Sequence, residues 1–265
     1  MHRSVVEPWS TDRARYFATI AEAVAVEAAA RVRRTVGHDQ VPRIKSSPTD
    51  VVTDADVEAE SFIREQLARL APGSGFEGEE LDDSVGENGV SWVIDPIDGT
   101  VNFVFGVPMA AVSIGAAINN HIVAGAVVSI YQAETFSAAI GAGARLNGRP
   151  IQVRRDGDSL SQALIATGFS YNERLRARQG EMLSRLLPIV RDVRCFGSAA
   201  LHLCWVANGR LDAYYESDLK YWDYAAGTLI ATEAGARVEA PDVDGANLLI
   251  AARPDIFDDL SRSLL

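Results

Sequence analysis

The sequence predicts a mixed α/β protein whose two subdomains pack as one unit. Three observations support this. Helical stripes fill the first 70 residues, short apolar segments punctuated by Gly and Asn follow, and the second half alternates strand and helix patterns. The 265 residues suffice for one large domain or two closely packed ones. Because the sequence shows no flexible linker and no internal repeat, we place the division near residue 150, between subdomains 1–150 and 151–265.

Two amphipathic helices are predicted before the first strand. Residues 10–34 repeat apolar side chains on one helical face, starting with Phe17, and Gly37 follows as a stop. Residues 54–70 repeat the pattern and end before Pro72.

A sheet meander is predicted next. Its apolar segments are residues 92–94, 110–118, 122–130, 135–140 and 151–153. Asn147-Gly148 predicts a two-residue hairpin turn before the last of them. The earlier run 76–87 has six acids and no base, and we interpret most of it as a solvated loop.

The second half predicts alternating strands and helices. We expect strands at 163–167 and 211–215 and helices at 176–187, 197–206 and 223–234. Residues 168–180 carry several arginines and match no pattern, so substrate contacts and subunit contacts both stay open for them.

Composition narrows the class of protein. A net charge of −11 argues against a nucleic-acid footprint, which is normally basic. Cys195 and Cys204 are the only cysteines, and we expect both to be buried thiols in a reducing compartment. The sequence shows neither a signal peptide nor an apolar run long enough to span a membrane. A cytoplasmic location is therefore expected.

The most informative stretch is Asp95-Pro96-Ile97-Asp98-Gly99-Thr100-Val101-Asn102-Phe103. An apolar strand leads into it, so both acids are expected where that strand ends. Carboxylates suit hard divalent cations, and exposed Gly and Thr amides suit a phosphate. Asp also favours turns, so turn formation is the simpler alternative. We favour a metal-assisted phosphate site.

Other candidate residues each have a purely structural alternative. Asp56 lies three residues after Thr53, the spacing of a capping box, and capping is compatible with an outward-facing acid. Asp223 follows Trp222 at a predicted helix start, where it would be a good N-cap. Glu79 and Lys45 alone would be read as surface charges.

Taken together and in order, several blocks of the chain resemble the inositol monophosphatase family, the magnesium-dependent, lithium-sensitive sugar-phosphate phosphatases. The blocks are Lys45-Ser46-Ser47-Pro48 with 53–56, Gly78-Glu79-Glu80, 92–103, Gly197-Ser198-Ala199, Asp212-Ala213-Tyr214-Tyr215-Glu216, Trp222-Asp223 and Glu233-Ala234-Gly235. The resemblance implies a layered αβαβα sandwich with the metals between the subdomains.

The resemblance also implies a ligand set for two or three Mg²⁺ ions. The ligands would be Glu79, Asp95, the Ile97 carbonyl, Asp98 and Asp223. Asp95 would bridge the first two ions. Glu79 and the Ile97 carbonyl would serve the first ion, and Asp98 and Asp223 the second. A weaker third ion would rest on Glu79 and, through water, on Asp56.

By the same resemblance, Asp56 and Thr100 would orient the attacking water and take its proton, with Glu79 and Lys45 assisting. The amides of Gly99 and Thr100 would hold the phosphate. The polyol would contact a larger set, namely Asp98, Gly197, Ser198, Ala199, Glu216 and Asp223. Li⁺ is expected to inhibit.

The activity implied is hydrolysis of inositol 1-phosphate, or a similar polyol monophosphate, by direct attack of a metal-activated water. A histidinol-phosphate or adenosine 3′,5′-bisphosphate phosphatase stays open. So does a regulatory binding partner in transcription or ribosome assembly. The resemblance implies a homodimer, a small phosphomonoester substrate, and neither nucleic acid nor membrane as a partner.

Overall fold

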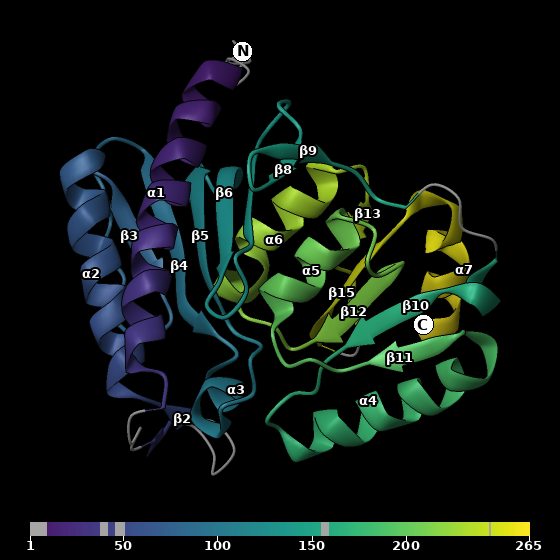
Figure 1. The fold of residues 1–265 in the computed structure, drawn as a ribbon. Coiled ribbons are helices and arrows are strands. Elements are labelled where there is room, and N and C mark those ends of the chain that lie inside the picture. The colour runs from purple at the N-terminus through teal and green to yellow at the C-terminus, as the bar shows by residue number, and fades with distance from the viewer. Residues whose placement is uncertain (1–9, 38–41, 46–50, 155–158, 244) are drawn as a thin grey trace, which may run out of the picture.

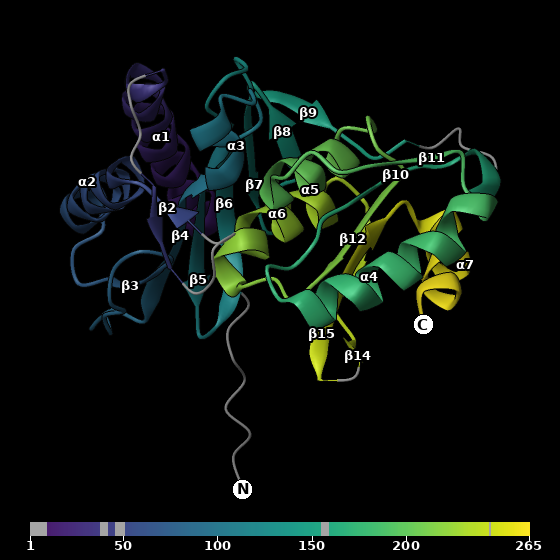
Figure 2. The ribbon, with the colours of Figure 1, turned by 90° about the horizontal axis from the view of Figure 1, so that it is seen from below.

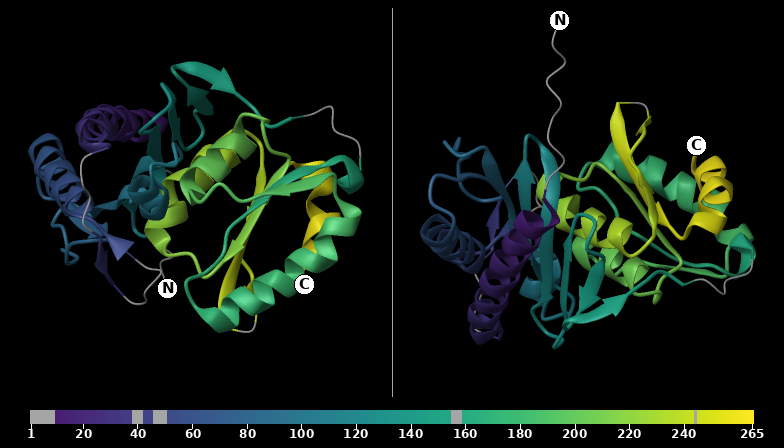
Figure 3. Two further views of the ribbon diagram at one scale, coloured as in Figure 1. Left: turned by 60° about the horizontal axis from the view of Figure 1, so that its bottom comes forward. Right: turned by 90° about the horizontal axis from the view of Figure 1, so that it is seen from above.

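Helices and sheets alternate in five layers (Figures 1 and 3). The computed structural model describes residues 10–37, 42–45, 51–154, 159–243 and 245–265. From the outside inward, α1 and α2 cover one sheet, α5 and α6 lie between the two sheets, and α4 and α7 cover the far face of the second sheet. This order confirms the predicted αβαβα sandwich.

The helix bounds follow from local signals. The helices are α1 (Thr11–Thr35), α2 (Asp54–Leu70), α3 (Thr100–Phe105), α4 (Glu173–Leu186), α5 (Ala199–Ala207), α6 (Tyr221–Glu233) and α7 (Pro254–Leu264). Short 3₁₀ turns occupy Leu160–Gln162 and Leu187–Ile189. The side chain of Ser10 accepts the Arg13 amide and so caps α1, whereas Thr53 and Asp56 form the predicted capping box of α2. The first two predicted helices are therefore confirmed.

The first sheet has seven strands in sequence order. They are β3 (Gly75–Gly78), β4 (Val90–Asp98), β5 (Ala111–Ile118), β6 (His121–Ser129), β7 (Thr135–Ala139), β8 (Ala144–Leu146) and β9 (Arg149–Ile151). All neighbours pair antiparallel except β3 and β4. Asn147 and Gly148 have φ of 50° and 74°, which suits the predicted hairpin turn between β8 and β9. The predicted meander is confirmed through β7, whereas β8 was not predicted and the last strand lies at Arg149–Ile151, two residues before the predicted 151–153.

Most of the acidic run 76–87 is the predicted loop, and only its start differs from the prediction. Its start belongs to β3, where Phe76 pairs with Trp92 and Gly78 with Ile94. Backbone pairing with β4 therefore prevails over the charge of the side chains. This pairing carries Glu79 directly to the edge of the sheet beside Asp95.

The second sheet is mixed. Its strands are β10 (Leu164–Thr167), β11 (Asp192–Arg194), β12 (Ala213–Ser217), β13 (Arg237–Glu239), β14 (Asp242–Val243) and β15 (Ala246–Ala252). The order is β11-β10-β12-β15-β13, with β14 also paired to β15. Strands β10, β11 and β12 run parallel, and β15 runs antiparallel to β12. A separate pair joins β1 (Arg43–Ile44) to β2 (Val51–Val52).

Several elements of the second half were not predicted or were misplaced. Strands β11, β13, β14 and β15 and helix α7 had no sequence prediction. Helix α6 begins at Tyr221, two residues before the predicted start, and Lys220 occupies the N-cap. Asp223 still caps this helix, but from its third position, because its carboxylate accepts the Lys220 amide at 2.7 Å. Figure 2 shows α4 and α7 together on the outer side of the second sheet.

The close approach of α6 to the first sheet follows from small side chains. A Cβ at Gly125 of β6 would lie 3.0 Å from Ala226, a tight contact, so glycine lets the helix approach closely there. The three main hydrophobic clusters fill the spaces between successive layers. The first sheet uses strands up to Ile151 and the second begins at Leu164. Within the described residues, no helix is both long enough and apolar enough to span a membrane.

Candidate active site

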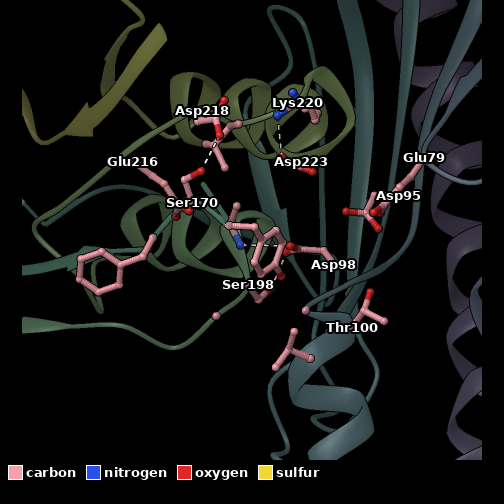
Figure 4. A pocket seen from close by; sticks show the side chains of 18 of the residues that line it. Glu79, Asp95, Asp98, Thr100, Ser170, Ser198, Glu216, Asp218, Lys220 and Asp223 are labelled. Atoms are coloured by element: carbon pink, nitrogen blue, oxygen red, sulfur yellow. Dashed lines mark hydrogen bonds between the residues drawn. The ribbon is translucent and has the colours of Figure 1, made fainter. Parts of the chain in front are cut away.

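One cavity of about 780 Å³ gathers nearly all the predicted site residues (Figure 4). It lies where β4, α3, α5, β12 and α6 come together. Those lining it are Lys45, Glu79, Asp95, Ile97, Asp98, Gly99, Thr100, Gly197, Ser198, Ala199, Glu216 and Asp223. Asp56 is the exception. It is fully buried behind Thr100 and reaches the cavity only through that residue.

The two acids of the central motif are set by an irregular strand end. Strand β4 runs through to Asp98, and its register with β5 shifts between Asp95 and Asp98. Asp95 therefore lies inside the strand, not after it as predicted. Its Oδ1 accepts the Ile97 amide at 3.1 Å, a turn closed by the side chain itself. This bulge turns both carboxylates toward the cavity.

Gly99 makes the tight turn from β4 into α3. Its φ is +99°, and a Cβ there would lie 2.8 Å from the Met109 carbonyl oxygen. Only glycine fits this conformation and this space. The turn leaves Thr100 as the first residue of α3, with its amide at a helix start that lines the cavity.

Asp98 joins the two halves of the protein. Its carboxylate accepts hydrogen bonds from the Ser198 hydroxyl, the Ala199 amide at 3.2 Å and the Ala200 amide at 2.8 Å. These are the free donors at the start of α5, where the helix dipole favours a negative charge. Ser198 and Ala199, predicted to contact the sugar, thus already bind Asp98. A substrate would meet them as an Asp98–Ser198 pair.

Glu79 and Glu80 share one cation. Lys45 Nζ lies 2.7 Å from Glu79 Oε1 and 2.5 Å from Glu80 Oε1. Burial lowers the pKa of Lys45, but the two glutamates outweigh burial and raise it overall. Burial, reinforced by the Glu79 charge, raises the pKa of Glu80 to about 7 although Lys45 opposes this. One lysine therefore faces two carboxylates.

Among the described residues, no cation comparable to Lys45 offsets the charge of the three central carboxylates, Asp95, Asp98 and Asp223. Burial is the main cause that raises the pKa of Asp95 and of Asp223 well above the usual range, and neighbouring carboxylates add to it. The pKa of Asp98 rises only to about 6, because burial is opposed by its three hydrogen bonds from α5. Two carboxylates ~4 Å apart repel by roughly 4 kcal/mol at an effective dielectric of 20. The cavity therefore favours the entry of positive charge.

The donor set fits a hard divalent cation. Glu79, Asp95, Asp98 and Asp223 offer carboxylate oxygens, and Ile97 offers a backbone carbonyl, all of the kind that Mg²⁺ prefers. In the part of the chain that the structure describes, no three acidic, histidine or cysteine side chains are gathered tightly enough to hold a metal ion as they stand. The carboxylates instead surround a shared space.

Thr100 connects the cavity to Asp56. Its hydroxyl oxygen lies 3.1 Å from Asp56 Oδ1 and 3.0 Å from the Ile97 carbonyl oxygen, and one proton serves only one of them at a time. Asp56 Oδ2 accepts both the amide and the hydroxyl of Thr53. Burial raises the pKa of Asp56, which makes this carboxylate a better proton acceptor.

Glu216 is the predicted residue on the opposite side. The Tyr214 hydroxyl donates to Glu216 Oε2 at 2.7 Å, and burial raises the pKa of Glu216 to about 7. The neighbouring loop makes room for it, since a Cβ at Gly168 would lie 2.0 Å from a Glu216 carboxylate oxygen. Loop 168–172 and β12 therefore form one wall of the cavity.

Hydrogen bonds that fix this wall were not foreseen. The buried Gln179 of α4 accepts the Ser170 amide at 2.8 Å and donates to Ser217 Oγ at 3.0 Å. Ser170 in turn donates to Asp218 Oδ2 at 2.6 Å (Figure 4). Gln179 lies in the 168–180 segment that matched no pattern, so the sequence carried no signal for it.

No function was predicted for Asn102, which lies in the central motif. Its side-chain amide donates to the Met109 carbonyl at 2.9 Å and to the Phe196 carbonyl at 2.6 Å, and so ties α3 to the approach to α5.

Cys195, beside Phe196, is exposed and lines the cavity, which corrects the prediction of a buried thiol. Cys204 is buried as predicted.

Comparison with known proteins decides the family. A sequence profile described as the inositol monophosphatase family matches residues 13–257. The chain belongs to the inositol monophosphatase family. Members of this family are metal-dependent, and this protein is a phosphoric monoester hydrolase.

Relatives in this family align with most of the chain. It is 48% identical over 267 residues to inositol-1-monophosphatase of Mycobacterium bovis, covering 93% of this chain and 92% of that protein. The solved structure of Mycobacterium tuberculosis SuhB superposes with a TM-score of 0.82 at 45% identity and 97% coverage of both chains. The Nus factor SuhB of Xylella fastidiosa is 41% identical over 208 residues, 76% of this chain and 75% of that protein.

Proposed function

We propose that this phosphatase is Mg²⁺-dependent and hydrolyses inositol 1-phosphate or a similar polyol monophosphate to the free polyol and phosphate. The observation that best supports this proposal is that Glu79, Asp95, Asp98 and Asp223 converge on the cavity that Glu216 also lines. Two or three Mg²⁺ ions would be held by these four carboxylates and the Ile97 carbonyl. When bound, Mg²⁺ supplies positive charge for the phosphate and a nearby water of lowered pKa.

Thr100 and Asp56 provide the path for the proton of the attacking water. The Thr100 hydroxyl takes a proton from that water as it passes its own proton to Asp56 Oδ1, 3.1 Å away. Asp56 holds this proton because burial has raised its pKa. The amides of Gly99 and Thr100 bind phosphate oxygens at the start of α3, and Lys45 limits the excess negative charge around Glu79.

The distal side of the cavity selects the leaving polyol. Glu216 accepts hydrogen bonds from sugar hydroxyls, and the Asp98–Ser198 pair meets the hydroxyl end beside the phosphate. The backbone around Gly197 and Ala199 completes the contact. A carboxylate at 216 repels a second phosphate, which favours a monophosphate over a bisphosphate.

A substrate panel at fixed Mg²⁺ tests this proposal. We expect the purified protein to release phosphate from inositol 1-phosphate faster than from histidinol phosphate or adenosine 3′,5′-bisphosphate, and only with Mg²⁺ present. Equal rates in excess chelator would refute the metal dependence. A faster rate with either competitor would reassign the substrate. Li⁺ is expected to inhibit, which a simple titration measures.

A second role is favoured by one comparison, since the relative from Xylella fastidiosa is named a Nus factor. The variant Asp98→Asn separates the two roles in cells. If growth or transcription phenotypes survive while phosphatase activity disappears, binding to a partner is the essential role.

We also propose a homodimer, which light scattering on the purified protein measures.

A further inference from the structure

The turn that carries Glu79 and Glu80 rests on a buried ion pair from α2. Glu60 is 0% exposed, and its Oε1 accepts Arg64 Nε at 2.8 Å. Its Oε2 accepts the Glu80 amide at 2.8 Å. The Leu81 amide also hydrogen-bonds to this carboxylate. Two successive backbone amides of the turn therefore point at one buried carboxylate.

Arg64 holds the other side of the same turn. Its Nη2 donates to the Leu81 carbonyl at 2.9 Å and its Nη1 to the Asp82 carbonyl at 2.7 Å. The pair thus satisfies both amides and carbonyls of the turn, in the fixed fork geometry of a guanidinium. Glycine at 78 is part of the fit, because a Cβ there would lie 2.1 Å from Glu60 Oε1.

The α2 side of this contact is rigid. Ile63 and Leu67 of α2 are fully buried in the first hydrophobic cluster, so the helix cannot shift without disturbing the core. On its other side, the turn is anchored to β4 by the Glu79 amide, which donates to the Ile94 carbonyl at 3.3 Å. The backbone of Glu79 is therefore held between a strand and a helix, although its side chain faces the cavity.

We propose that Glu60 and Arg64 are positioning residues that set the Mg²⁺ affinity of the site by fixing the Glu79–Glu80 turn. This rests on the Mg²⁺ dependence proposed above. Metal ligation tolerates distance errors of only ~0.2 Å, and loss of an outer partner of a ligand typically costs ~10–100-fold in metal affinity. Neither residue lines the cavity, so their effect must pass through the turn.

Calorimetric titration of the metal-free protein with Mg²⁺ tests this. Glu60→Gln keeps the volume but removes the charge, and Arg64→Met removes the guanidinium. Each is expected to raise the Mg²⁺ dissociation constant ~10-fold or more, while kcat at saturating Mg²⁺ stays within a few-fold of the original. If Arg64→Met fails to fold because it leaves the buried Glu60 carboxylate unpaired, Glu60→Gln still decides, because it removes the buried charge itself and leaves an arginine that is 14% exposed.

Two controls separate positioning from general stability. Asp212→Asn breaks another buried carboxylate pair, in which Asp212 accepts the Leu164 amide at 2.8 Å and faces Arg253 Nε at 3.2 Å. Glu65→Gln changes an exposed acid on the same helix. We expect Asp212→Asn to lower the melting temperature and Glu65→Gln to change little, both with Mg²⁺ affinity unchanged.

Unchanged affinity in Glu60→Gln and Arg64→Met, or an equal loss in Asp212→Asn, would overturn the inference. The failure of the proposed function looks different, because the unmodified protein would then show no Mg²⁺ binding at all.

Discussion

The two sides of the cavity differ in how closely they crowd negative charge. The acidic wall, defined as Glu79, Asp95 and Asp98, faces one cation, Lys45 against Glu79, while Asp95 and Asp98 accept only amide and hydroxyl donors. The distal wall, defined as Glu216, Ser170 and Asp218, is fixed mainly by hydroxyl and amide donors, namely those of Tyr214, Ser170 and Gln179. The distal wall gives each of its two carboxylates a hydroxyl donor, whereas the acidic wall crowds its carboxylates together, and their mutual repulsion favours the entry of a cation.

The largest expected effect comes from removing the central charge of the acidic wall. Asp95→Asn should lower kcat by at least ~100-fold, more than the loss of an outer-shell partner, because Asp95 would bridge two ions. Steady-state kinetics across a Mg²⁺ series measures this. A rate near that of the original protein would reject the bridging role of Asp95.

The next largest effect is expected from a substitution in the distal wall. Glu216→Gln removes a charged acceptor for the sugar hydroxyls, and we expect KM for inositol 1-phosphate to rise ~10-fold, as for a hydrogen bond to a charged group worth ~1.5 kcal/mol. The Mg²⁺ concentration for half-maximal activity should not move. If that concentration shifts instead, Glu216 belongs to the acidic wall and the contrast between the walls fails.

A smaller effect is expected from substitution of Gln179, the α4 residue that supports the distal wall. Gln179→Met keeps the length of the side chain but removes the three hydrogen bonds by which Gln179 links loop 168–172 to β12. A loss of ~1 kcal/mol in substrate binding raises KM about 5-fold. Gln179→Glu is the companion variant, since it keeps the acceptor for the Ser170 amide and should recover part of the loss. Equal KM values for all three proteins would show that the loop is held by other contacts.

The smallest effect is a pH dependence of stability. The pKa of Asp98 is about 6 in the folded protein, above its ordinary value of 3.8. The folded state thus binds this proton more tightly, so its stabilisation is full below pH ~4 and is lost as pH rises toward 6. Glu216, with a folded pKa of about 7 against 4.5, acts in the same direction up to pH 7. Metal-free protein should therefore lose stability through these groups between pH 5 and 7.5.

Thermal melts with and without Mg²⁺ isolate the contribution of Asp98, because Glu216 is not a proposed Mg²⁺ ligand. Added Mg²⁺ should raise the melting temperature by a few degrees more at pH 7.5 than at pH 5, since ~1 kcal/mol corresponds to ~2–4 °C in a chain of this size. Burial lowers the pKa of His202 to about 3, so this residue acts in the opposite direction. His202 lies outside the cavity lining and acts equally with and without Mg²⁺, so the difference between the two melts removes it. An equal Mg²⁺ effect at both pH values would contradict the uncompensated charge.

Local patterns in the sequence were enough for much of the fold. Helices α1 and α2, strands β5 to β7 and the hairpin turn at Asn147-Gly148 all follow from apolar spacing and from cap and turn residues. Where the prediction failed, nonlocal contacts decided. Strand β3 forms in an acidic run because β4 offers a backbone partner, and α6 begins early because Lys220 and Asp223 close its first turn together.

By itself, the sequence determined the chemistry available to this protein: a pair of acids before Gly99-Thr100, and further acids at separate places along the chain. Only the tertiary structure decided which of these acids share one cavity. It placed Asp56 behind Thr100, set Asp98 against the start of α5, and put Glu60 and Arg64 beneath the Glu79 turn. The physical reason is that burial and charge depend on neighbours far away in the chain, and neither is encoded by local spacing.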